Sequence, residues 1–265
     1  MKKIDMELNI MGLLNSLISL INGGEENASD VTIAKYLLEN YNRLQDLNIY
    51  DIAEQCYVDR STIRRLSKKL GFDNFKDLKK QFADFSIEYA SYRSGINNGK
   101  PGNTVVQQIT NMAKECENFF DDKRTEAIIQ EMHQASQIVF LTFDVYSRQS
   151  SEFQKAMILS GKMVRVITSK FENNEILPNL KDNDMLIVIS LAGHFVSQVS
   201  HLIVENKAKK ILLTTVRNEL YNTIFDEIWY LSSSPKLEKR SVYTVYATQY
   251  CLEKLFAAYI KKYKQ

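Results

Sequence analysis

Positive charge is concentrated in one short stretch of this 265-residue chain. The segment VDRSTIRRLSKKLGF, residues 58–72, holds five Lys and Arg side chains, and residues 60–80 hold eight against two Asp. Such cations bind phosphate oxygens, and arginine also bonds guanine edges in the major groove of DNA. The formal net charge of the whole chain is only +2, so any basic surface is local.

Apolar residues within this stretch fix which side chains face outward. Ile63, Leu66 and Leu70 recur at helical spacing and predict one buried face. We expect the Asp59 carboxylate to cap the helix and Gly71 to end it as a C′ glycine. The residues left outside are the expected DNA contacts: Arg60, Ser61, Thr62, Arg64, Arg65, Lys68 and Lys69.

A short amphipathic helix is predicted immediately before the basic one, over NIYDIAEQC, residues 48–56. A brief turn at Tyr57 and Val58 joins the two. This is the helix-turn-helix layout, in which the start of the second helix enters the major groove. The alternative is that the basic residues form a solvated helix face without a partner. The short preceding helix, the turn and the glycine stop favour the helix-turn-helix over this alternative.

These motifs resemble the RpiR (MurR/RpiR) family of bacterial transcriptional regulators. The family's recognition helix carries Thr-x-x-Arg, followed by Leu-Gly-Phe, a further Phe and Leu-Lys. The corresponding residues here are Thr62, Arg65, LGF at 70–72, NF at 74–75 and LK at 78–79. The resemblance covers about residues 1–90 and implies a helix-turn-helix DNA-binding domain there. Independently of it, an apolar stripe of leucines and isoleucines between residues 13 and 21 predicts a helix at about 6–22.

The second half of the chain predicts a parallel sheet. A segment rich in Gly and Asn, residues 91–104, is expected to be a linker, and a helix is expected at about 105–131. Short runs that are apolar on both faces then predict buried strands at 137–143, 163–168, 184–190, 209–215 and 227–233. The expected fold of residues 105–265 is a five-stranded α/β/α sandwich closed by a helix at about 238–262.

The resemblance implies that this sandwich is a SIS (sugar isomerase) domain, a flavodoxin-like fold that binds phosphosugars. Its glycine- and hydroxyl-rich turns are altered here to TFDVYSRQS after the first strand and SLAGHF after the third. The effector-binding residues implied by the resemblance are Ser147, Ser190 and Gly193. His194 lies in the same loop and is added as a cationic donor to a phosphate or carboxylate, and a loop histidine without a ligand role is the alternative. Asp144 opposes phosphate binding, whereas Ser147, Ser150 and Ser151 also suit a helix N-cap.

The function predicted is therefore an RpiR-type transcriptional regulator of sugar or amino-sugar metabolism that responds to a phosphosugar-like metabolite. The expected partners are double-stranded DNA with a palindromic operator, a small-molecule effector, and copies of the same chain in a homodimer or homotetramer. One alternative is a regulator whose SIS domain has become a dimerisation scaffold. A remote alternative is a sugar-phosphate isomerase using Glu152 and His194.

Several classes of protein are disfavoured by composition. Three cysteines far apart in sequence predict neither a disulfide framework nor a zinc site, and fit a reducing cytoplasm. His194 and His201 lack carboxylate or cysteine partners, so no metal is expected. No run of eighteen apolar residues is present, so a transmembrane span is not expected. We expect no catalytic residue and no cofactor.

Overall fold

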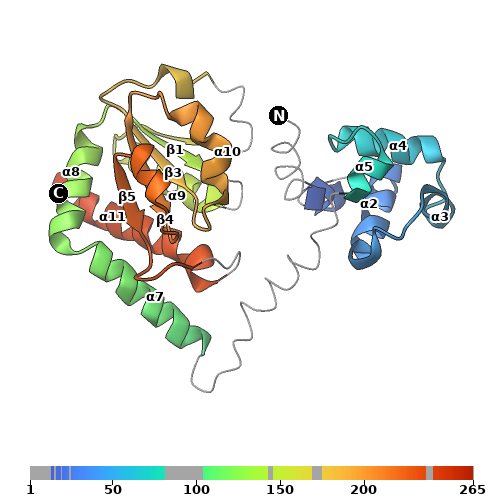
Figure 1. The fold of residues 1–265 in the computed structure, drawn as a ribbon, viewed down its shortest axis with the longest axis horizontal. Helices are drawn as coiled ribbons and strands as arrows, with labels where there is room; N and C mark the ends of the chain where they lie inside the picture. The colour runs from blue at the N-terminus through green and yellow to red at the C-terminus, as the bar shows by residue number, and fades with distance from the viewer. Residues whose placement is uncertain are drawn as a thin grey trace. The chain divides into compact units, whose positions relative to one another are not determined.

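A computed structural model describes residues 13, 14, 16–18, 20–23, 25–80, 104–142, 146–168, 175–236 and 241–264. The chain divides into two compact units, Met1–Ala90 and Ser91–Gln265, and each is described by itself (Figure 1). Of the expected linker, residues 91–103 lie outside the described part of the chain. Where the structure describes the chain, no helix is long and apolar enough to cross a membrane.

The N-terminal unit is helical. It contains a helical stretch within residues 13–23, then α2 (Ser29–Glu39), the 3₁₀ turn η1 (Tyr41–Arg43), α3 (Ile49–Gln55), α4 (Arg60–Lys69) and α5 (Phe75–Lys80). The predicted helix at about 6–22 is confirmed only from residue 13, because residues 6–12 are not described. The two helices expected around Tyr57 and Val58 are confirmed as α3 and α4.

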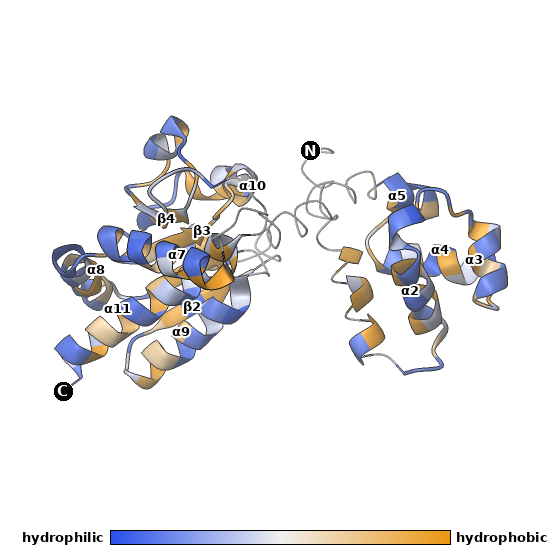
Figure 2. Ribbon diagram, turned by 90° about the horizontal axis from the view of Figure 1, so that it is seen from below, coloured by the Kyte–Doolittle hydropathy of each residue, from blue (hydrophilic) through white to orange (hydrophobic). Residues whose placement is uncertain are grey.

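One apolar cluster holds this unit together. Ile63 and Leu66 of α4 are buried with Ile33 and Leu37 of α2, and Ile52 of α3 belongs to the same cluster. Helices of seven to eleven residues are marginal in isolation, so their stability here comes from this shared packing. Figure 2 shows hydrophobic and hydrophilic residues alternating around these helices, as one-sided burial requires.

The predicted glycine stop of α4 is confirmed. Gly71 has φ 91°, its amide donates to the Lys68 carbonyl at 3.0 Å, and the Phe72 amide donates to the Ser67 carbonyl at 2.9 Å. These two bonds form a Schellman motif, which places the residue after the C-cap in the left-handed region. Phe72 is buried, so the same turn also brings an aromatic ring into the core.

The C-terminal unit contains a parallel sheet of five strands. They are β1 (Ile138–Thr142), β2 (Val164–Ile167), β3 (Met185–Ile189), β4 (Lys209–Thr214) and β5 (Glu227–Tyr230), in the order β2-β1-β3-β4-β5. This is the flavodoxin-like order. The five predicted strands and their parallel arrangement are confirmed.

Helices cover both faces of the sheet. On one face α7 (Val105–Phe119), α8 (Asp122–Gln134), α9 (Ser147–Leu159) and α11 (Thr248–Tyr263) share a core with alternate strand residues. On the other lies α10 (His194–Ile203), which packs near the 3₁₀ turn η5 (Leu177–Asn179). Figure 1 shows the sheet between α10 and the layer that contains α8 and α11. The α/β/α sandwich is therefore confirmed.

Two predicted helices differ from the structure. The single helix expected at 105–131 is two helices, because Phe120 leaves the helical conformation to enter the core and Asp121 caps α8, with Oδ1 accepting from the Arg124 amide at 2.8 Å. In the C-terminal segment, the π-helical turn η7 (Tyr243–Ala247) precedes α11. Buried residues of both pack in the sheet core, which accounts for the apolar stripe of this segment.

Replacing Gly71 by Ala should destabilise the N-terminal unit. A Cβ in the left-handed region costs about 1 kcal/mol, so we expect the melting temperature of this unit to fall by roughly 4–8 °C. Far-ultraviolet circular dichroism measures it, and Trp229, the single tryptophan of the chain, reports separately on the sheet. As a control, Gly23→Ala meets nothing within 4 Å and should not destabilise the unit. An unchanged melting temperature for Gly71→Ala would show that the left-handed turn does not require glycine.

Candidate functional site

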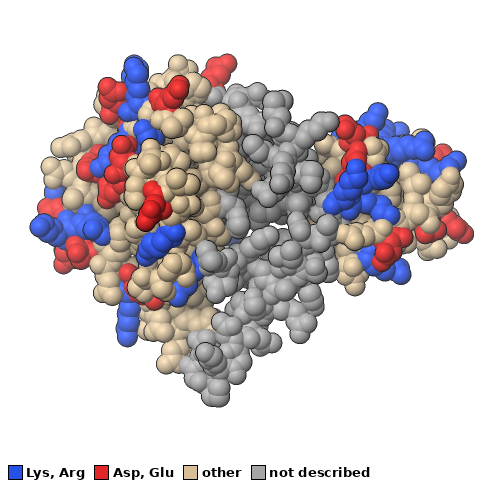
Figure 3. Space-filling model, in the orientation of Figure 1, with Lys and Arg blue, Asp and Glu red and all other residues tan. Residues whose placement is uncertain are grey.

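The outermost side chains of α4 form a narrow stripe. Ser61, Arg65 and Lys68 follow one another at helical spacing, opposite the buried Ile63 and Leu66. All three stripe residues are exposed, and within the described residues the side chains of Arg65 and Lys68 make no hydrogen bond or ion pair. Figure 3 shows Lys and Arg side chains gathered over α4 and α5 on the visible face of the N-terminal unit. The stripe is therefore open to an anionic partner.

The two flanks of this stripe are tied to neighbouring helices. On one side, the Arg60 guanidinium lies 4.5 Å from the ring centroid of Tyr50, which belongs to α3. On the other, Lys69 Nζ lies 2.7 Å from Asp30 Oδ2 on α2. Lys69 was expected to face a partner freely, but its charge is already matched by a carboxylate. Among the predicted contacts, Arg65 and Lys68 are thus better placed than Lys69.

The start of α4 differs from the prediction in one respect. Asp59 occupies the N-cap position, but its carboxylate makes no capping hydrogen bond. Its backbone carbonyl instead accepts from the Thr62 amide at 2.9 Å. Thr62 is half-buried, whereas Ser61 and Arg64 are exposed. A carboxylate close to the first turn therefore remains in the surface through which α4 would approach a phosphate backbone.

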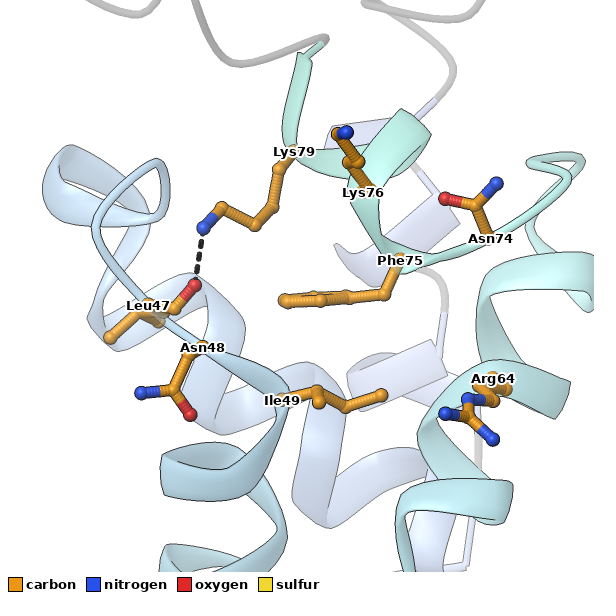
Figure 4. Close-up of a pocket in the computed structure, with 8 residues that line it drawn as sticks. All are labelled: Leu47, Asn48, Ile49, Arg64, Asn74, Phe75, Lys76 and Lys79. Carbon is orange, nitrogen blue, oxygen red and sulfur yellow. Dashed lines mark hydrogen bonds between the residues drawn. The ribbon is translucent and has the colours of Figure 1, made fainter.

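A cavity of about 360 Å³ lies beside α4, between the start of α3 and α5. Figure 4 shows Phe75 and Ile49 extending into it, with Arg64 and Lys79 on opposite sides. Lys79 donates to the Leu47 carbonyl, so its ammonium is held at the rim. The remaining lining residues are Asn48, Asn74 and Lys76. An apolar floor with cations at its edge suits a deoxyribose and its phosphate.

In the C-terminal unit, the expected effector site lies where β1 and β3 end. These strands are neighbours, and the connections after them run to opposite sides, so a topological switch point lies between them. Ligands of open α/β sheets bind at such a point. Of the predicted residues, Ser190 and Gly193 follow β3, His194 begins α10, and Ser147 begins α9. The side chain of His194 is outside the described part of the structure.

Ser190 is engaged within the protein. Its hydroxyl accepts from the backbone amides of Phe195 at 3.1 Å and Val196 at 3.3 Å. These amides belong to the first turn of α10, where a phosphate would bind. Ser190 therefore serves as a cap for α10, and a phosphate at this helix end would have to displace its hydroxyl.

Gly193 is required by both its backbone and its surroundings. It has φ 83°, and a Cβ placed there would lie 2.6 Å from Tyr221 Oη. Tyr221 comes from the 3₁₀ turn η6 (Glu219–Thr223), and burial raises the pKa of its phenol. The space beside the turn after β3 is thus occupied by a tyrosine, which no sequence motif indicated.

Two polar groups in the helices that follow β1 and β3 lack partners in the described structure. Gln149 Oε1 of α9 and Gln198 Oε1 of α10 are buried without a hydrogen bond in the described structure. Buried carbonyl oxygens normally accept from a donor, so these two acceptors are unsatisfied within the described protein. No sequence motif singled them out, because an isolated glutamine carries no signal of burial. Within the described residues, no cluster of His, Cys, Asp or Glu could hold a metal ion.

Comparison with known proteins identifies the first unit. Residues 11–88 match the helix-turn-helix domain of the rpiR family. The N-terminal unit is an rpiR-family domain. A relative that covers both units is the HTH-type transcriptional regulator GlvR of Bacillus subtilis, which is 23% identical over 88% of this chain and 90% of its own length. By these similarities residues 11–88 form an rpiR-family helix-turn-helix domain, and the chain as a whole is similar to a helix-turn-helix transcriptional regulator.

Two other matches agree with this assignment. An uncharacterised HTH-type transcriptional regulator of Caldanaerobacter subterraneus subsp. tengcongensis is 28% identical over 33% of this chain and 32% of its own length. Among solved structures, Vibrio vulnificus NanR in complex with ManNAc-6P aligns with a TM-score of 0.52 and 16% identity, over 95% of this chain and 92% of NanR. This likeness shows a shared two-domain fold.

If Ser190 caps α10, then Ser190→Ala should destabilise the sheet unit without any ligand. Loss of a hydroxyl that accepts from two amides of the first turn of α10 should lower the free energy of unfolding by about 1–2 kcal/mol. Urea unfolding followed by Trp229 fluorescence measures this change. Ser200→Ala is the control, because the Ser200 hydroxyl makes only a 3.5 Å contact with the Ser197 carbonyl. If both variants unfold at the parent's midpoint, Ser190 is not a structural cap.

Proposed function

We propose that α4 of this RpiR-type regulator reads a DNA operator through its outward stripe. The observation that carries the proposal is the stripe itself: Arg65 and Lys68 are exposed and unpaired among the described residues, on a helix whose opposite face is buried. The proposed base contacts lie toward the start of the helix, which is the part that enters the groove: Ser61, Thr62, Arg64 and Arg65. Lys68 and Lys76 are proposed to bind phosphates.

The regulator is proposed to act as a homodimer on a palindromic operator. Twofold pairing holds two recognition helices at a fixed separation, which matches two half-sites on the duplex. An effector in the sheet unit would act by binding one spacing of these helices more tightly than another. Because the DNA it controls is cytoplasmic in bacteria, we also place the regulator in the cytoplasm.

Reversing two charges on the stripe side of α4 should abolish operator binding. We expect Arg64→Glu with Arg65→Glu to abolish binding of the full chain to a duplex selected by the parent from a random library. The control is Lys207→Glu with Lys261→Glu, an equal change in net charge at exposed positions of the other unit. Fluorescence anisotropy across salt concentrations measures both.

The salt dependence of the same measurement separates the kinds of interaction. Removing one cation that binds a phosphate should reduce the slope of log K against log salt by about 0.9. Retained affinity with an unaltered slope in the double variant would show that α4 is not the recognition helix. Loss of binding in the control as well would show that net charge, and not α4, governs binding.

For the effector, we propose a phosphosugar-like metabolite bound between the ends of β1 and β3. The support is chemical: sugar hydroxyl or amine groups would supply the donors that Gln149 Oε1 and Gln198 Oε1 lack. Because Ser190 already bonds two amides of α10, we expect the sugar portion to contribute more to affinity than the phosphate.

We propose that the chain is not an enzyme. Isomerisation needs a positioned base, and the candidate Glu152 is exposed. Its Oε1 lies 2.8 Å from Lys155 Nζ, and this hydrogen bond and charge lower the pKa of the Glu152 carboxyl, which makes it a weaker base.

A ligand that binds only the folded sheet unit must raise its melting temperature, by an amount equivalent to about 2.7 kcal/mol at one hundred times its Kd. We expect the melting temperature of the full chain's sheet unit to rise with one of several sugar and amino-sugar phosphates, ManNAc-6P among them. Trp229 fluorescence measures this melting temperature. Gln149→Leu combined with Gln198→Leu should abolish the shift. No shift across the panel would favour the alternative in which the sheet unit is a dimerisation scaffold.

A further inference from the structure

Tyr57 adopts a backbone conformation that disfavours its own side chain. Its φ is 52°, and it is the only residue other than glycine with positive φ in the described part of the chain. In the left-handed region the Cβ atom crowds the following carbonyl oxygen, so a residue with positive φ is strained there unless it is glycine. The strain arises in the turn between α3 and α4, two residues before the N-cap of α4.

In the described part of this unit, the same backbone motif ends both α3 and α4, and glycine occupies it only after α4. At the end of α3, the Tyr57 amide donates to the Glu54 carbonyl at 3.3 Å and the Val58 amide to the Ala53 carbonyl at 3.0 Å. This is the Schellman pattern that also ends α4, where Gly71 takes the left-handed position. A glycine would therefore satisfy the turn after α3 equally well, and the backbone gives no reason for a tyrosine.

The Tyr57 side chain gives no compensating packing. Tyr57 is 96% exposed, and among the described residues its side chain makes no hydrogen bond or ring contact. Its surroundings are those of the recognition surface: Arg60 follows three residues later, with its guanidinium over the ring of Tyr50, which is itself 63% exposed. Arg60 thus has one exposed phenol beside it in space, Tyr50, and a second three residues before it in the sequence, Tyr57.

We propose that Tyr57 contacts the sugar-phosphate backbone of operator DNA at the edge of the groove that α4 enters. The phenol donates to a phosphate oxygen, as tyrosine does in protein–DNA interfaces, and the ring covers the adjacent deoxyribose. A strained residue held in place at a binding surface is a recurrent feature of functional sites. This inference rests on the proposed function of α4. It adds an uncharged DNA contact, the Tyr57 phenol, to the contacts made by the cations of α4.

The test combines stability with binding. Tyr57→Gly should raise the melting temperature of the N-terminal unit by about 4 °C, because the left-handed strain is released. The same variant should lose about tenfold in affinity for the selected duplex, the effect of losing one hydrogen bond to a charged group. Tyr57→Ala should lose the same affinity without the gain in melting temperature, because alanine keeps the Cβ. Tyr57→Asn controls for the greater backbone freedom of glycine in the turn. Asparagine tolerates the left-handed conformation, so this variant should bind the duplex as weakly as Tyr57→Gly.

Salt dependence distinguishes this phenol from a cation. A phenol releases no counterion, so the Tyr57 variants should weaken binding equally at every salt concentration, with an unchanged slope. Lys68→Ala, in contrast, should reduce the slope by about 0.9, because one phosphate then keeps its counterions. Parent-like affinity of Tyr57→Gly for the duplex would overturn the inference, even if the variant self-associated differently from the parent. A melting temperature that does not rise in Tyr57→Gly would also overturn it, because the tyrosine would then not be strained. If the parent itself bound neither the selected duplex nor a mixed-sequence duplex, the proposed function would fail first.

Discussion

The burial of Ile63 and Leu66 is the constraint on which the proposed DNA-facing surface of α4 depends. A helix has one rotation that places both residues in the core shared with α2 and α3, and that rotation turns Ser61, Arg65 and Lys68 outward. The basic residues therefore need no mutual contacts to be aligned, because the apolar face aligns them. Neighbouring helices then restrain the flanks, through the Arg60–Tyr50 contact and the Lys69–Asp30 ion pair.

Helix ends set the angle at which these elements meet. The turns after α3 and α4 use the same pair of backbone hydrogen bonds, and each requires a residue in the left-handed region. Gly71 meets that requirement without strain, whereas Tyr57 places an exposed ring beside the start of α4. The local backbone geometry is thus shared, and the difference lies in what the side chain offers a partner.

The sheet unit differs from the N-terminal unit, because its own side chains occupy part of the expected site, whereas the stripe on α4 is open. Its strand order places a topological switch point between the ends of β1 and β3, but the chain's own groups occupy part of the space around the turn after β3. Ser190 holds the first amides of α10, and Tyr221 lies against Gly193. Gln149 and Gln198, on the helices that follow these two strands, carry buried acceptors that have no donor in the described structure, and the proposal of a hydroxylated effector rests on them.

The sequence by itself determined the helix-turn-helix, the exposed basic face of α4, the glycine stop and the five parallel strands. Each of these follows from a local pattern, since apolar spacing and turn residues act within a few positions of the chain. Only the tertiary structure decided that Lys69 is paired with Asp30, that Phe120 divides the predicted helix and that Ser190 is a cap. It also revealed Tyr221, Gln149 and Gln198, because contacts between residues distant in sequence depend on how the elements pack.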